Sequence, residues 1–297
     1  MQESNNNLER EAILRDEEEQ IGQDAGGQET QCPFECAYSD DRKWVNKASM
    51  VVFHIRDLTD LPPPNHSRLN VFFLIESAAH SGNVYRNLPP NYFNMTVTYR
   101  ADSDVYWPND AFEMIIPDQT PPENIWQEQE ILEKVVKKTK LVLQLVSNCQ
   151  THSAREIYTS ELKKYVSLTE YGSCSGNECP GDGCLYEKID EHMFYLAFEN
   201  SICKHYVTEK FWYMKRLIVP IVLSRKPFKG LGIPESTFIS AEDFDSPQQL
   251  SQHLIFLQKN PAQYMKYFEW TKYYKSGERL IHYVNCVNGQ WRKENNK

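Results

Sequence analysis

Short apolar runs recur along the chain and predict buried strands. Two continuous runs lie at 50–55 (MVVFHI) and 70–75 (NVFFLI), and the segment 94–100 (NMTVTYR) alternates apolar with polar residues. Continuous apolar runs are typical of strands that are covered on both faces, whereas alternation is typical of a half-buried strand. The first part of the chain is therefore predicted to contain a sheet.

After a proline-containing segment at 117–122, apolar runs alternate with charged stretches of helical pattern. Strands are predicted at 140–147, 194–200, 217–223 and 237–240, and helices at 123–138, 152–166 and 207–216. Ser246 followed by Pro247 is a capping pattern that predicts the start of one more helix. Because strands alternate with helices, the predicted fold class is α/β, with a parallel sheet covered on both faces.

The length of 297 residues allows two domains, each with its own core. Residues 1–31 are polar and acidic, contain no apolar strand, and are predicted to form a disordered tail or stalk. The rest is predicted to divide into an N-terminal domain at 32–130, a C-terminal domain at 131–275 and a tail at 276–297. The charged helical stretch at 123–138 is the expected connection between the domains.

The formal net charge of −9 is concentrated at the N-terminus. Residues 1–30 carry nine acidic and two basic side chains, so the remainder of the chain is close to neutral. No basic stripe of the kind that neutralises phosphates is present, and nucleic acid is therefore not an expected partner.

Eight cysteines, together with the sequons at Asn65 and Asn94, favour an oxidising compartment. The alternative is that the sequons arise by chance and the cysteines are free thiols. The spacing of Cys174, Cys179 and Cys184 is not that of a zinc finger, so disulfides or free thiols are expected there. The chain shows no signal peptide and no apolar segment long enough for a membrane anchor.

Polar residues follow two of the predicted strands, where an open parallel sheet binds its ligands. Ser147 and Asn148 end the strand at 140–147, and Glu199 and Asn200 end the strand at 194–200. Arg155 and Lys210 follow at the starts of the next two helices, where two cations can neutralise a diphosphate. Glu199 or Glu209 can hold ribose hydroxyls. The alternative is that these are ordinary residues of a helix's first turn. Neither a GxGxxG nor a P-loop sequence occurs.

At these positions the chain resembles the α1,3-fucosyltransferase family. The segment 195–210 (YLAFENSICKHYVTEK) is similar to a long family signature, and 138–149 (KTKLVLQLVSNC) followed by Arg155 is similar to a second one. Further matches follow the family's order: 52–57 (VFHIRD), 73–77 (FLIES) and 99–104 (YRADSD). The resemblance implies a GT-B architecture, with two Rossmann-like domains facing a central cleft and the donor held by the C-terminal one.

The resemblance also implies roles for individual residues. Arg155 and Lys210 would meet the phosphates of GDP-fucose, Tyr206 would add a phosphate hydrogen bond, and Glu209 would bind the ribose. Four further residues would line the same donor pocket: Ser147, Asn148, Glu199 and Asn200.

Glu76 would be the general base, because it matches the Glu of the family's Glu-Ser motif, although Ala78 stands where the family has Pro. Inversion at the sugar carbon needs one carboxylate to take the proton of the acceptor hydroxyl. Apart from the resemblance, Glu76 is a polar residue at a strand end. Asp102 and Asp104 imitate a DxD metal motif, but they belong to the matched segment 99–104 and are interpreted as structural. No cofactor is expected to be required, with a divalent cation such as Mn²⁺ acting at most as a stimulant.

The expected function is that of an inverting fucosyltransferase, which moves L-fucose from GDP-fucose to a GlcNAc hydroxyl of a glycoprotein glycan, forming an α1,3 link. The acceptor would be an N-glycan or a LacNAc- or LacdiNAc-type unit, and the resemblance implies the Golgi lumen. Two alternatives remain: a catalytically silent glycan- or nucleotide-binding protein on the same fold, and a transferase for another nucleotide sugar.

Overall fold

The computed structural model describes residues 11–15, 37–56, 58, 60–277, 286–287 and 290–291. The chain forms two compact units, one of Met1–Pro108 with Ile281–Lys297 and one of Asn109–Leu280. We refer to them as the N-terminal unit and the C-terminal unit. Each is described by itself below.

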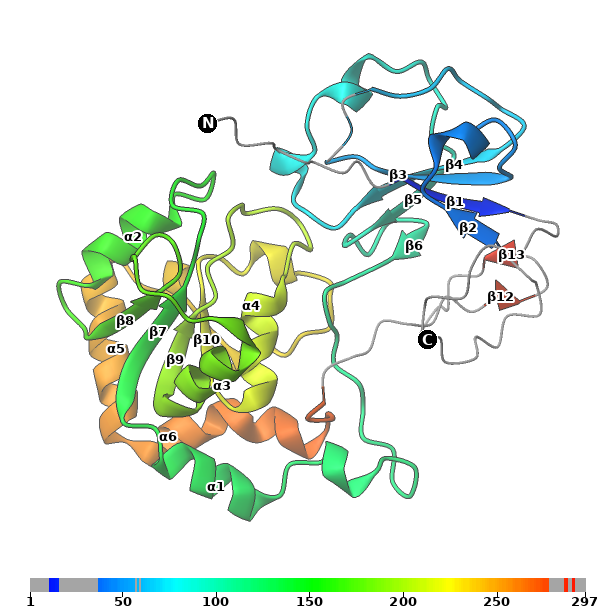
Figure 1. Ribbon diagram of the computed structural model, residues 1–297. Coiled ribbons are helices and arrows are strands. Elements are labelled where there is room, and N and C mark those ends of the chain that lie inside the picture. The colour runs from blue at the N-terminus through cyan, green and yellow to red at the C-terminus, as the bar shows by residue number, and fades with distance from the viewer. Residues whose placement is uncertain are drawn as a thin grey trace. The chain divides into compact units, whose positions relative to one another are not determined.

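The N-terminal unit contains a six-stranded sheet in the order β2-β1-β3-β4-β5-β6 (Figure 1). Its strands are β1 (Glu11–Arg15), β2 (Ala37–Ser39), β3 (Met50–His54), β4 (Leu69–Leu74), β5 (Met95–Thr98) and β6 (Val105–Tyr106). The strands β3 to β6 run parallel, and β1 and β2 are antiparallel to their neighbours. Val51 and Phe53 of β3 are fully buried, with Tyr92 packed against Phe53, so the core lies on one face of this strand.

The predicted strands at 50–55, 70–75 and 94–100 correspond to β3, β4 and β5. The expectation that residues 1–31 contain no strand is wrong for β1, whose backbone pairs with both β2 and β3. Only three consecutive apolar residues, 12–14, mark this strand, and a run of that length is too short to stand out from a polar tail. The other residues of 1–31 lie outside the described part of the chain.

The described connections in the N-terminal unit contain only 3₁₀ helices, at Arg42–Trp44, Ala78–His80 and Val84–Asn87. A short antiparallel pair, β12 (Cys286–Val287) with β13 (Gln290–Trp291), forms a separate two-stranded sheet.

The C-terminal unit is a five-stranded parallel sheet in the order β11-β10-β9-β7-β8. Its strands are β7 (Lys140–Leu145), β8 (Leu168–Tyr171), β9 (His192–Leu196), β10 (Val219–Val222) and β11 (Ile239–Ser240). Its α-helices are α1 (Glu128–Val136), α2 (Arg155–Leu162), α3 (Gly181–Glu191), α4 (Glu209–Trp212), α5 (Pro247–Lys259) and α6 (Pro261–Tyr264). The 3₁₀ helices are Pro122–Asn124, Tyr213–Arg216, Lys226–Phe228, Glu235–Thr237, Ala241–Asp243 and Met265–Lys272.

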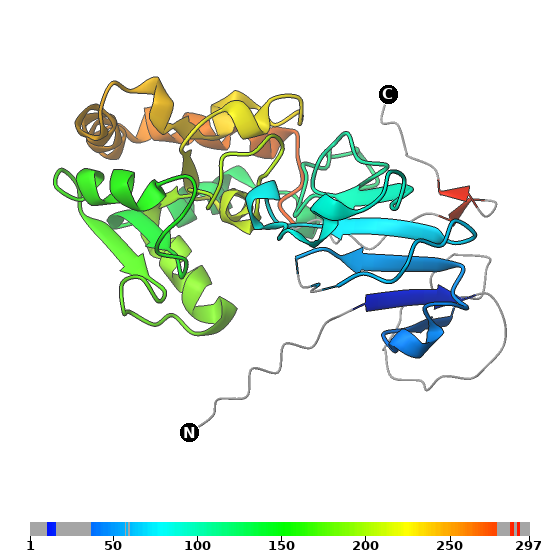
Figure 2. The same cartoon turned by 90° about the horizontal axis from the view of Figure 1, so that it is seen from above.

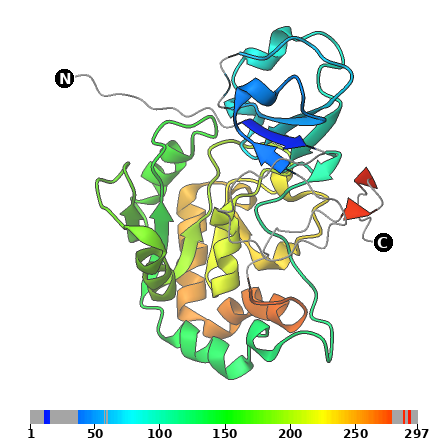
Figure 3. The same cartoon turned by 45° about the vertical axis from the view of Figure 1, so that its right-hand side comes forward.

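Helices cover both faces of this sheet, as the alternating pattern predicted. Figure 2 shows α5 on one side of the strands and α3 on the other, and α2 packs against α5. Every residue of the central strand β9 is buried, because both of its faces are covered. Figure 3 shows α1 and α6 near the end of the sheet where β7 begins. The loops that follow the strands therefore lie at the opposite end of the sheet.

Two details differ from the sequence prediction. The stretch at 207–216 is not one helix but α4 followed by the 3₁₀ helix Tyr213–Arg216, and Leu217 ends it with a left-handed φ of 63°. The chain enters the C-terminal unit at Asn109, whereas the predicted boundary was residue 130. Residues after 109 belong to this unit because the Phe112 ring packs among the rings of Trp212, Trp270 and Tyr274. Across the described residues, no helix has the length and apolarity needed to span a membrane.

Candidate active site

The order of the strands in the C-terminal unit defines where a ligand site belongs. The chain builds outward from β7 to β8 on one side and from β9 through β10 to β11 on the other. Neighbouring strands whose connections leave in opposite directions form a switch point, and ligands of open α/β sheets bind in the crevice beyond it. The site is therefore expected beyond the carboxyl ends of β7 and β9, where Ser147, Asn148, Glu199 and Asn200 lie.

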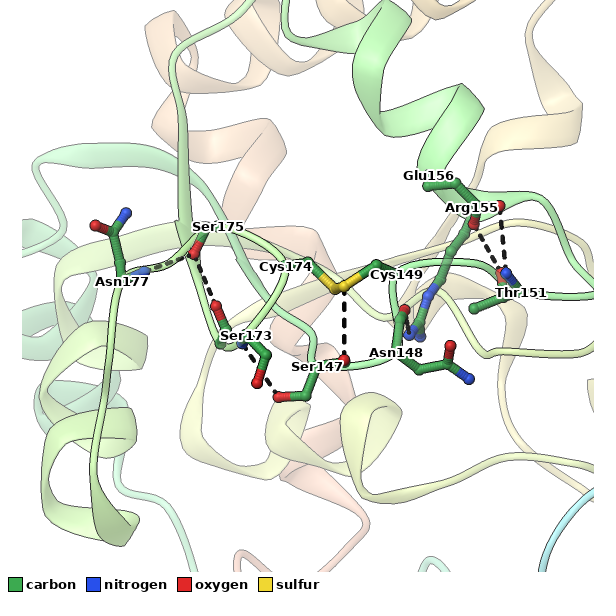
Figure 4. Close-up of a disulfide and its surroundings, with 11 residues drawn as sticks. Ser147, Asn148, Cys149, Thr151, Arg155, Glu156, Ser173, Cys174, Ser175 and Asn177 are labelled. Atoms are coloured by element: carbon green, nitrogen blue, oxygen red, sulfur yellow. Dashed lines mark hydrogen bonds between the residues drawn. A yellow bond between two sulfur atoms is a disulfide. The ribbon is translucent and has the colours of Figure 1, made fainter. Parts of the chain in front are cut away.

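Arg155 ties the two loops of the switch point together. It is the first residue of α2 and its side chain is almost fully buried. One guanidinium nitrogen, Nη1, donates to Phe198 O at 2.7 Å in the β9 loop. The other, Nη2, donates to Asn148 O at 3.0 Å in the β7 loop, and Figure 4 shows Arg155 beside Asn148. Burial lowers the pKa of Arg155, while the nearby Glu199 carboxylate opposes that shift. The guanidinium thus places a positive charge between the loops and uses only part of its five N–H donors there.

Ser153 makes a second connection between the same loops. Its hydroxyl donates to Glu199 O at 2.6 Å, and its backbone N–H donates to Asn200 O at 3.0 Å. Ala154 follows with a left-handed φ of 53°, which turns the chain into α2. The side-chain Oδ1 of Asn200 is buried and has no hydrogen-bond partner among the described residues. A buried acceptor in this state is a group that a bound ligand can satisfy.

Glu199 and Lys210 form the charged part of the β9 loop. The Glu199 carboxylate is buried and accepts from Thr208 N at 2.7 Å and from the Thr208 hydroxyl. Burial raises the pKa of Glu199, although Lys210 and Thr208 oppose the shift. Lys210 Nζ lies 3.6 Å from Glu199 Oε2 and 2.7 Å from Glu209 Oε1. Burial alone would lower the pKa of Lys210, but the two carboxylates outweigh it and raise that pKa. The ammonium therefore stays charged.

The remaining donor candidates differ in exposure. Tyr206 is buried, and its backbone N–H donates to Cys203 O. Glu209 starts α4 with a side chain that is 55% exposed. Ser147 and Asn148 are exposed in the β7 loop.

A disulfide between Cys149 and Cys174 fastens the β7 loop to the loop after β8, as Figure 4 shows. The backbone N–H of Ser173 donates to Ser147 Oγ at 3.4 Å. Gly172 allows the loop after β8 to approach Val146 closely, because a Cβ at position 172 would lie 2.4 Å from Val146 O. The φ of Gly172 is +95°, a value that also favours glycine. Sequence reasoning expected disulfides but gave no pairing. Cys149 directly follows Ser147 and Asn148 in the sequence, and this position could have indicated that a disulfide supports the site.

A second disulfide joins Cys179 to Cys184, and Cys203 is a free thiol. For Cys174, Cys179 and Cys184 the sequence left disulfides or free thiols open, and all three form disulfides. Disulfides of this kind form and persist in oxidising compartments.

A pocket of about 740 Å³ opens beside α2, close to the switch point. Ser153 and Ala154 before α2, Tyr158 on α2, Leu223 after β10 and Pro247 at the start of α5 contribute to its wall. The Tyr158 hydroxyl is buried without a partner in the described part of the chain, and burial raises the pKa of Tyr158 to about 12. The hydroxyl therefore remains a hydrogen-bond donor at any physiological pH.

Glu76 belongs to the N-terminal unit, two residues after β4. Its Oε1 accepts from Arg56 Nη1 at 3.1 Å, and its Oε2 lies 4.0 Å from His80 Nδ1. The same His80 nitrogen is 2.9 Å from the Ser77 hydroxyl. The Glu76 side chain is 27% exposed, so the carboxylate is oriented by its neighbours and still reaches solvent.

The two carboxylates that imitate a metal motif are bound to protein groups. Arg100 donates to both oxygens of Asp102, at 2.8 and 2.6 Å, and Asp104 accepts from the backbone and hydroxyl of Thr96. The structural interpretation of Asp102 and Asp104 agrees with these contacts. Within the described residues, no group of three or more His, Cys, Asp or Glu side chains is arranged to hold a metal ion.

These features define a two-unit α/β protein with a cation-bearing site at the switch point of its C-terminal sheet. The C-terminal model of glycosyltransferase family 10 (fucosyltransferase) matches residues 135–291, and an N-terminal fucosyltransferase model matches residues 10–110. The chain belongs to this family, as its motifs indicated.

Several curated proteins are similar to the chain. The α-(1,3)-fucosyltransferase fut-5 of Caenorhabditis elegans is 34% identical, over 81% of this chain and 65% of that protein. The glycoprotein 3-α-L-fucosyltransferase A of Drosophila melanogaster is 30% identical, over 86% of this chain and 50% of that protein. The chain thus spans between one half and two thirds of the length of these relatives.

A solved structure described as an α1,3-fucosyltransferase with GDP-fucose matches with a TM-score of 0.50 and 17% identity, covering 82% of this chain and 72% of that one. At this identity the match concerns the fold, and it confirms the predicted α/β fold of GT-B type.

Proposed function

We propose that this protein is an inverting fucosyltransferase that moves L-fucose from GDP-fucose to a GlcNAc hydroxyl of a glycoprotein glycan, forming an α1,3 link. The observation that carries the proposal is the switch point of the C-terminal sheet, where Arg155 and Lys210 place two positive charges at the end of the sheet that binds ligands in such folds. The names of the similar fucosyltransferases support the choice of fucose as the transferred sugar and of the linkage.

In this reaction the acceptor oxygen forms a bond to C1 of fucose while the bond from C1 to the phosphate oxygen breaks. The hydroxyl proton passes to the Glu76 carboxylate, and GDP leaves with the electron pair of the broken bond. Negative charge develops on the departing diphosphate, so fixed cations such as Arg155 and Lys210 stabilise the transition state more than the ground state.

Each remaining candidate takes a defined place in this proposal. Glu209 binds the ribose, Tyr206 donates to a phosphate, and Asn200 offers its buried Oδ1 to a donor group of the ligand. The wall of the proposed donor pocket is completed by Ser147, Asn148 and Glu199. Arg56 and His80 hold the Glu76 carboxylate in one orientation, which proton transfer requires.

We propose further that transfer requires no metal ion, because the two cations already supply the charge that a metal would bring to the leaving group. Addition of EDTA is expected to leave the rate within about twofold of the untreated enzyme, since no step then depends on a bound metal. A loss of transfer that added Mn²⁺ restores would contradict this part of the proposal.

We place the protein in the Golgi lumen with an N-glycan or a LacNAc- or LacdiNAc-type acceptor. The two disulfides favour an oxidising lumen, and a relative named as acting on a glycoprotein supports a glycan acceptor.

One observation favours a second candidate, a catalytically silent nucleotide- or glycan-binding protein. Arg155 is almost fully buried and donates to two backbone carbonyls, so it can serve the fold alone. The experiment below separates the two functions.

The test combines transfer and binding. The purified protein is incubated with GDP-fucose and a set of defined glycans, and products are identified by mass, while GDP binding is measured by calorimetry. Glu76→Gln is expected to lower kcat by a factor of about 10² to 10⁴ and to leave GDP affinity unchanged. Asp60→Asn is the matched control, because Asp60 pairs with Arg42 in the same unit at 3.3 Å on an exposed surface. GDP binding without any transfer by the unaltered protein would establish the silent alternative.

A further inference from the structure

The loop that joins β9 to α4 contains a histidine whose backbone is in an uncommon conformation. His205 has a left-handed φ of 66°, is 7% exposed, and directly precedes Tyr206 in the sequence. Outside glycine this conformation costs free energy, and it persists only where surrounding contacts hold the residue in place. The contacts of His205 are therefore the ones that determine how the chain enters α4.

His205 is bonded to the loop after β10 through both its backbone and its side chain. Its backbone N–H donates to Pro227 O at 3.0 Å. Its ring Nε2 lies 3.2 Å from Lys229 O, and because a carbonyl oxygen can only accept, Nε2 carries the proton in this contact. One residue of the β9 loop thus makes two hydrogen bonds to the short stretch 227–229.

The loop after β10 is itself held firmly by its neighbours. The centroid of the Phe228 ring lies 4.8 Å from that of Phe211 in α4 and 4.7 Å from that of Phe238. Arg225 donates to both carboxylate oxygens of Asp243, which follows β11. The loop that receives the hydrogen bonds of His205 is therefore packed against α4 and joined to the loop of the next strand.

The β9 loop is consequently held from two sides. At its start, Arg155 donates to Phe198 O and the Ser153 hydroxyl donates to Glu199 O, so this part is bonded to the β7 side. At its end, His205 bonds it to the β10 side. Tyr206 follows His205 directly, and Lys210 lies in the short helix α4 that comes next. The placement of these two side chains therefore depends most directly on the contacts of His205.

We propose that His205 is a positioning residue, which places Tyr206 and Lys210 for contact with the phosphates of the donor. The inference rests on the proposed function in one respect, namely that Tyr206 and Lys210 meet a nucleoside diphosphate. It does not require that transfer takes place. A site that is already held in its binding conformation loses less freedom when the ligand binds, so loss of the contact between His205 and 227–229 lowers the affinity for the diphosphate.

The test compares two variants at position 205 of the full chain. His205→Phe keeps a ring of similar size but has no N–H to donate to Lys229 O. His205→Gln keeps a donor, because its amide nitrogen can take the place of Nε2. A residue that only fills space would be replaced better by Phe than by Gln, so the order of the two variants separates the proposed role from simple packing.

The matched control is His192→Phe. His192 is also buried, and its ring nitrogens lie 2.6 Å from Lys188 O and 2.8 Å from the Thr169 hydroxyl. It is the first residue of β9, so it lies at the opposite end of the strand from the loop that contains His205. The same substitution there removes a buried hydrogen-bonded histidine without touching the proposed donor site.

Three quantities are measured for each protein: the melting temperature, the hydrogen exchange of the backbone amides of 206–210, and the affinity for GDP by calorimetry. His205→Phe is expected to speed the exchange by about tenfold and to lower GDP affinity by about tenfold. His205→Gln should bring both quantities to within about twofold of the unaltered protein. His192→Phe should lower the melting temperature, because buried hydrogen bonds are lost, and should keep GDP affinity within about twofold.

Unchanged GDP affinity in His205→Phe would overturn the inference, and so would an equal loss in His205→Gln or in His192→Phe. If the unaltered protein binds GDP but transfers no fucose, the proposed function fails, whereas the same affinities still decide the role of His205. No binding of GDP by the unaltered protein would overturn both.

Discussion

The charged side chains of the candidate site are held differently in the two units. In the C-terminal unit the candidate groups are buried and bonded: Arg155 joins two loops, and Glu199 is held by Thr208. In the N-terminal unit Glu76 is partly exposed and is oriented by Arg56, whose own side chain is 49% exposed. Both described disulfides also lie in the C-terminal unit.

The difference fits the roles that we propose for the two units. In the proposed reaction the diphosphate donor is the same in every turnover, so a preorganised, rigid pocket would serve it well. Glycan acceptors would vary, and loops with fewer buried contacts adapt to different ligands more readily. The comparison predicts that substitutions in the proposed donor site lower both the free energy of unfolding and the affinity for GDP. Substitutions around Glu76 should lower kcat alone.

The largest expected effect is that of Arg155→Met set against Arg56→Met. Loss of the Arg155 guanidinium leaves Phe198 O without its donor, and a hydrogen bond to a charged group contributes about 1.5 to 3 kcal/mol. We expect a free energy of unfolding lower by about 3 kcal/mol and GDP affinity lower by at least about tenfold. These are measured by urea unfolding and calorimetry.

Arg56→Met is expected to change the free energy of unfolding by less than about 1 kcal/mol, because its ion pair with Glu76 is exposed. GDP affinity should stay unchanged, while kcat falls by about tenfold as Glu76 loses its orienting contact. The comparison between the units breaks down if Arg155→Met keeps full GDP affinity or if Arg56→Met weakens it.

A second effect, smaller than the first on GDP affinity, concerns the disulfide at the site. Cys149 and Cys174 are 25 residues apart, and closure of such a loop stabilises the folded state by about 3.5 kcal/mol. Replacement of both by Ser is expected to cost that amount and to weaken GDP binding several-fold, because the Ser147 and Asn148 loop is no longer fastened. Thermal unfolding and calorimetry provide the measurement.

The matched control is Cys179→Ser with Cys184→Ser, whose loop of 5 residues should cost only about 2 kcal/mol. This pair lies at the start of α3, away from the switch-point loops, so GDP affinity should not change. Equal losses of GDP affinity in both double variants would show that the first disulfide has no special link to the site.

A third effect distinguishes the C-terminal unit by its pH dependence. Lys138 is buried, and burial lowers its pKa to about 7, while its ammonium donates to Ile189 O and His192 O. In the unfolded chain the pKa of a lysine is about 10.4. Between these two values the unfolded state binds more protons, so the free energy of unfolding rises as the pH increases from about 7 to 10.

Lys138→Met removes this titration and should flatten that rise. Urea unfolding at pH 7, 8 and 9 gives the slope for both proteins, and Lys140→Met serves as an exposed control on the adjoining strand. An unchanged slope in Lys138→Met would mean that other groups govern stability in this range.

The buried strands of both units could be predicted from the sequence more reliably than the edge strands. The apolar runs at 140–147 and 194–200 correspond to β7 and β9, because strands that are covered on both faces are rich in apolar residues. The edge strand β8 was missed because none of its residues is fully buried, so its four residues show no apolar run. The helix α3 was missed because glycines stand at its first and third positions and only two of its side chains, Leu185 and Ile189, are buried.

For the candidate site, family motifs placed the residues at the ends of the correct strands but could not show what they contact. No spacing rule indicates that Arg155 would reach Phe198 O, since that carbonyl lies 43 residues away. The disulfide partner of Cys149 could not be predicted either, because eight cysteines allow many pairings.

The smallest expected effect concerns the two sequons, which both lie in the N-terminal unit and differ in their local structure. Asn65 Oδ1 accepts from the backbone N–H of Ser67 at 3.0 Å and from the Ser67 hydroxyl, which leaves the side-chain nitrogen available. Asn94 Oδ1 instead accepts from Asn70 N at 2.8 Å, and its Nδ2 donates to Arg68 O at 3.4 Å, so its amide helps to join the starts of β4 and β5. We expect higher glycan occupancy at Asn65 than at Asn94 when the chain is expressed through a secretory pathway, as measured by mass spectrometry of the peptides.

The same contacts predict how the unglycosylated variants behave. Asn65→Gln should change the free energy of unfolding by no more than about 0.5 kcal/mol, because a surface loop can rearrange. Asn94→Gln should cost about 1 to 2 kcal/mol, because Asn70 N then loses its acceptor in a partly buried position. Occupancy at Asn94 equal to that at Asn65, together with a neutral Asn94→Gln, would show that the N-terminal sheet tolerates change at this edge. The contrast with the tightly bonded C-terminal unit would then extend from the loops of the N-terminal unit into its sheet.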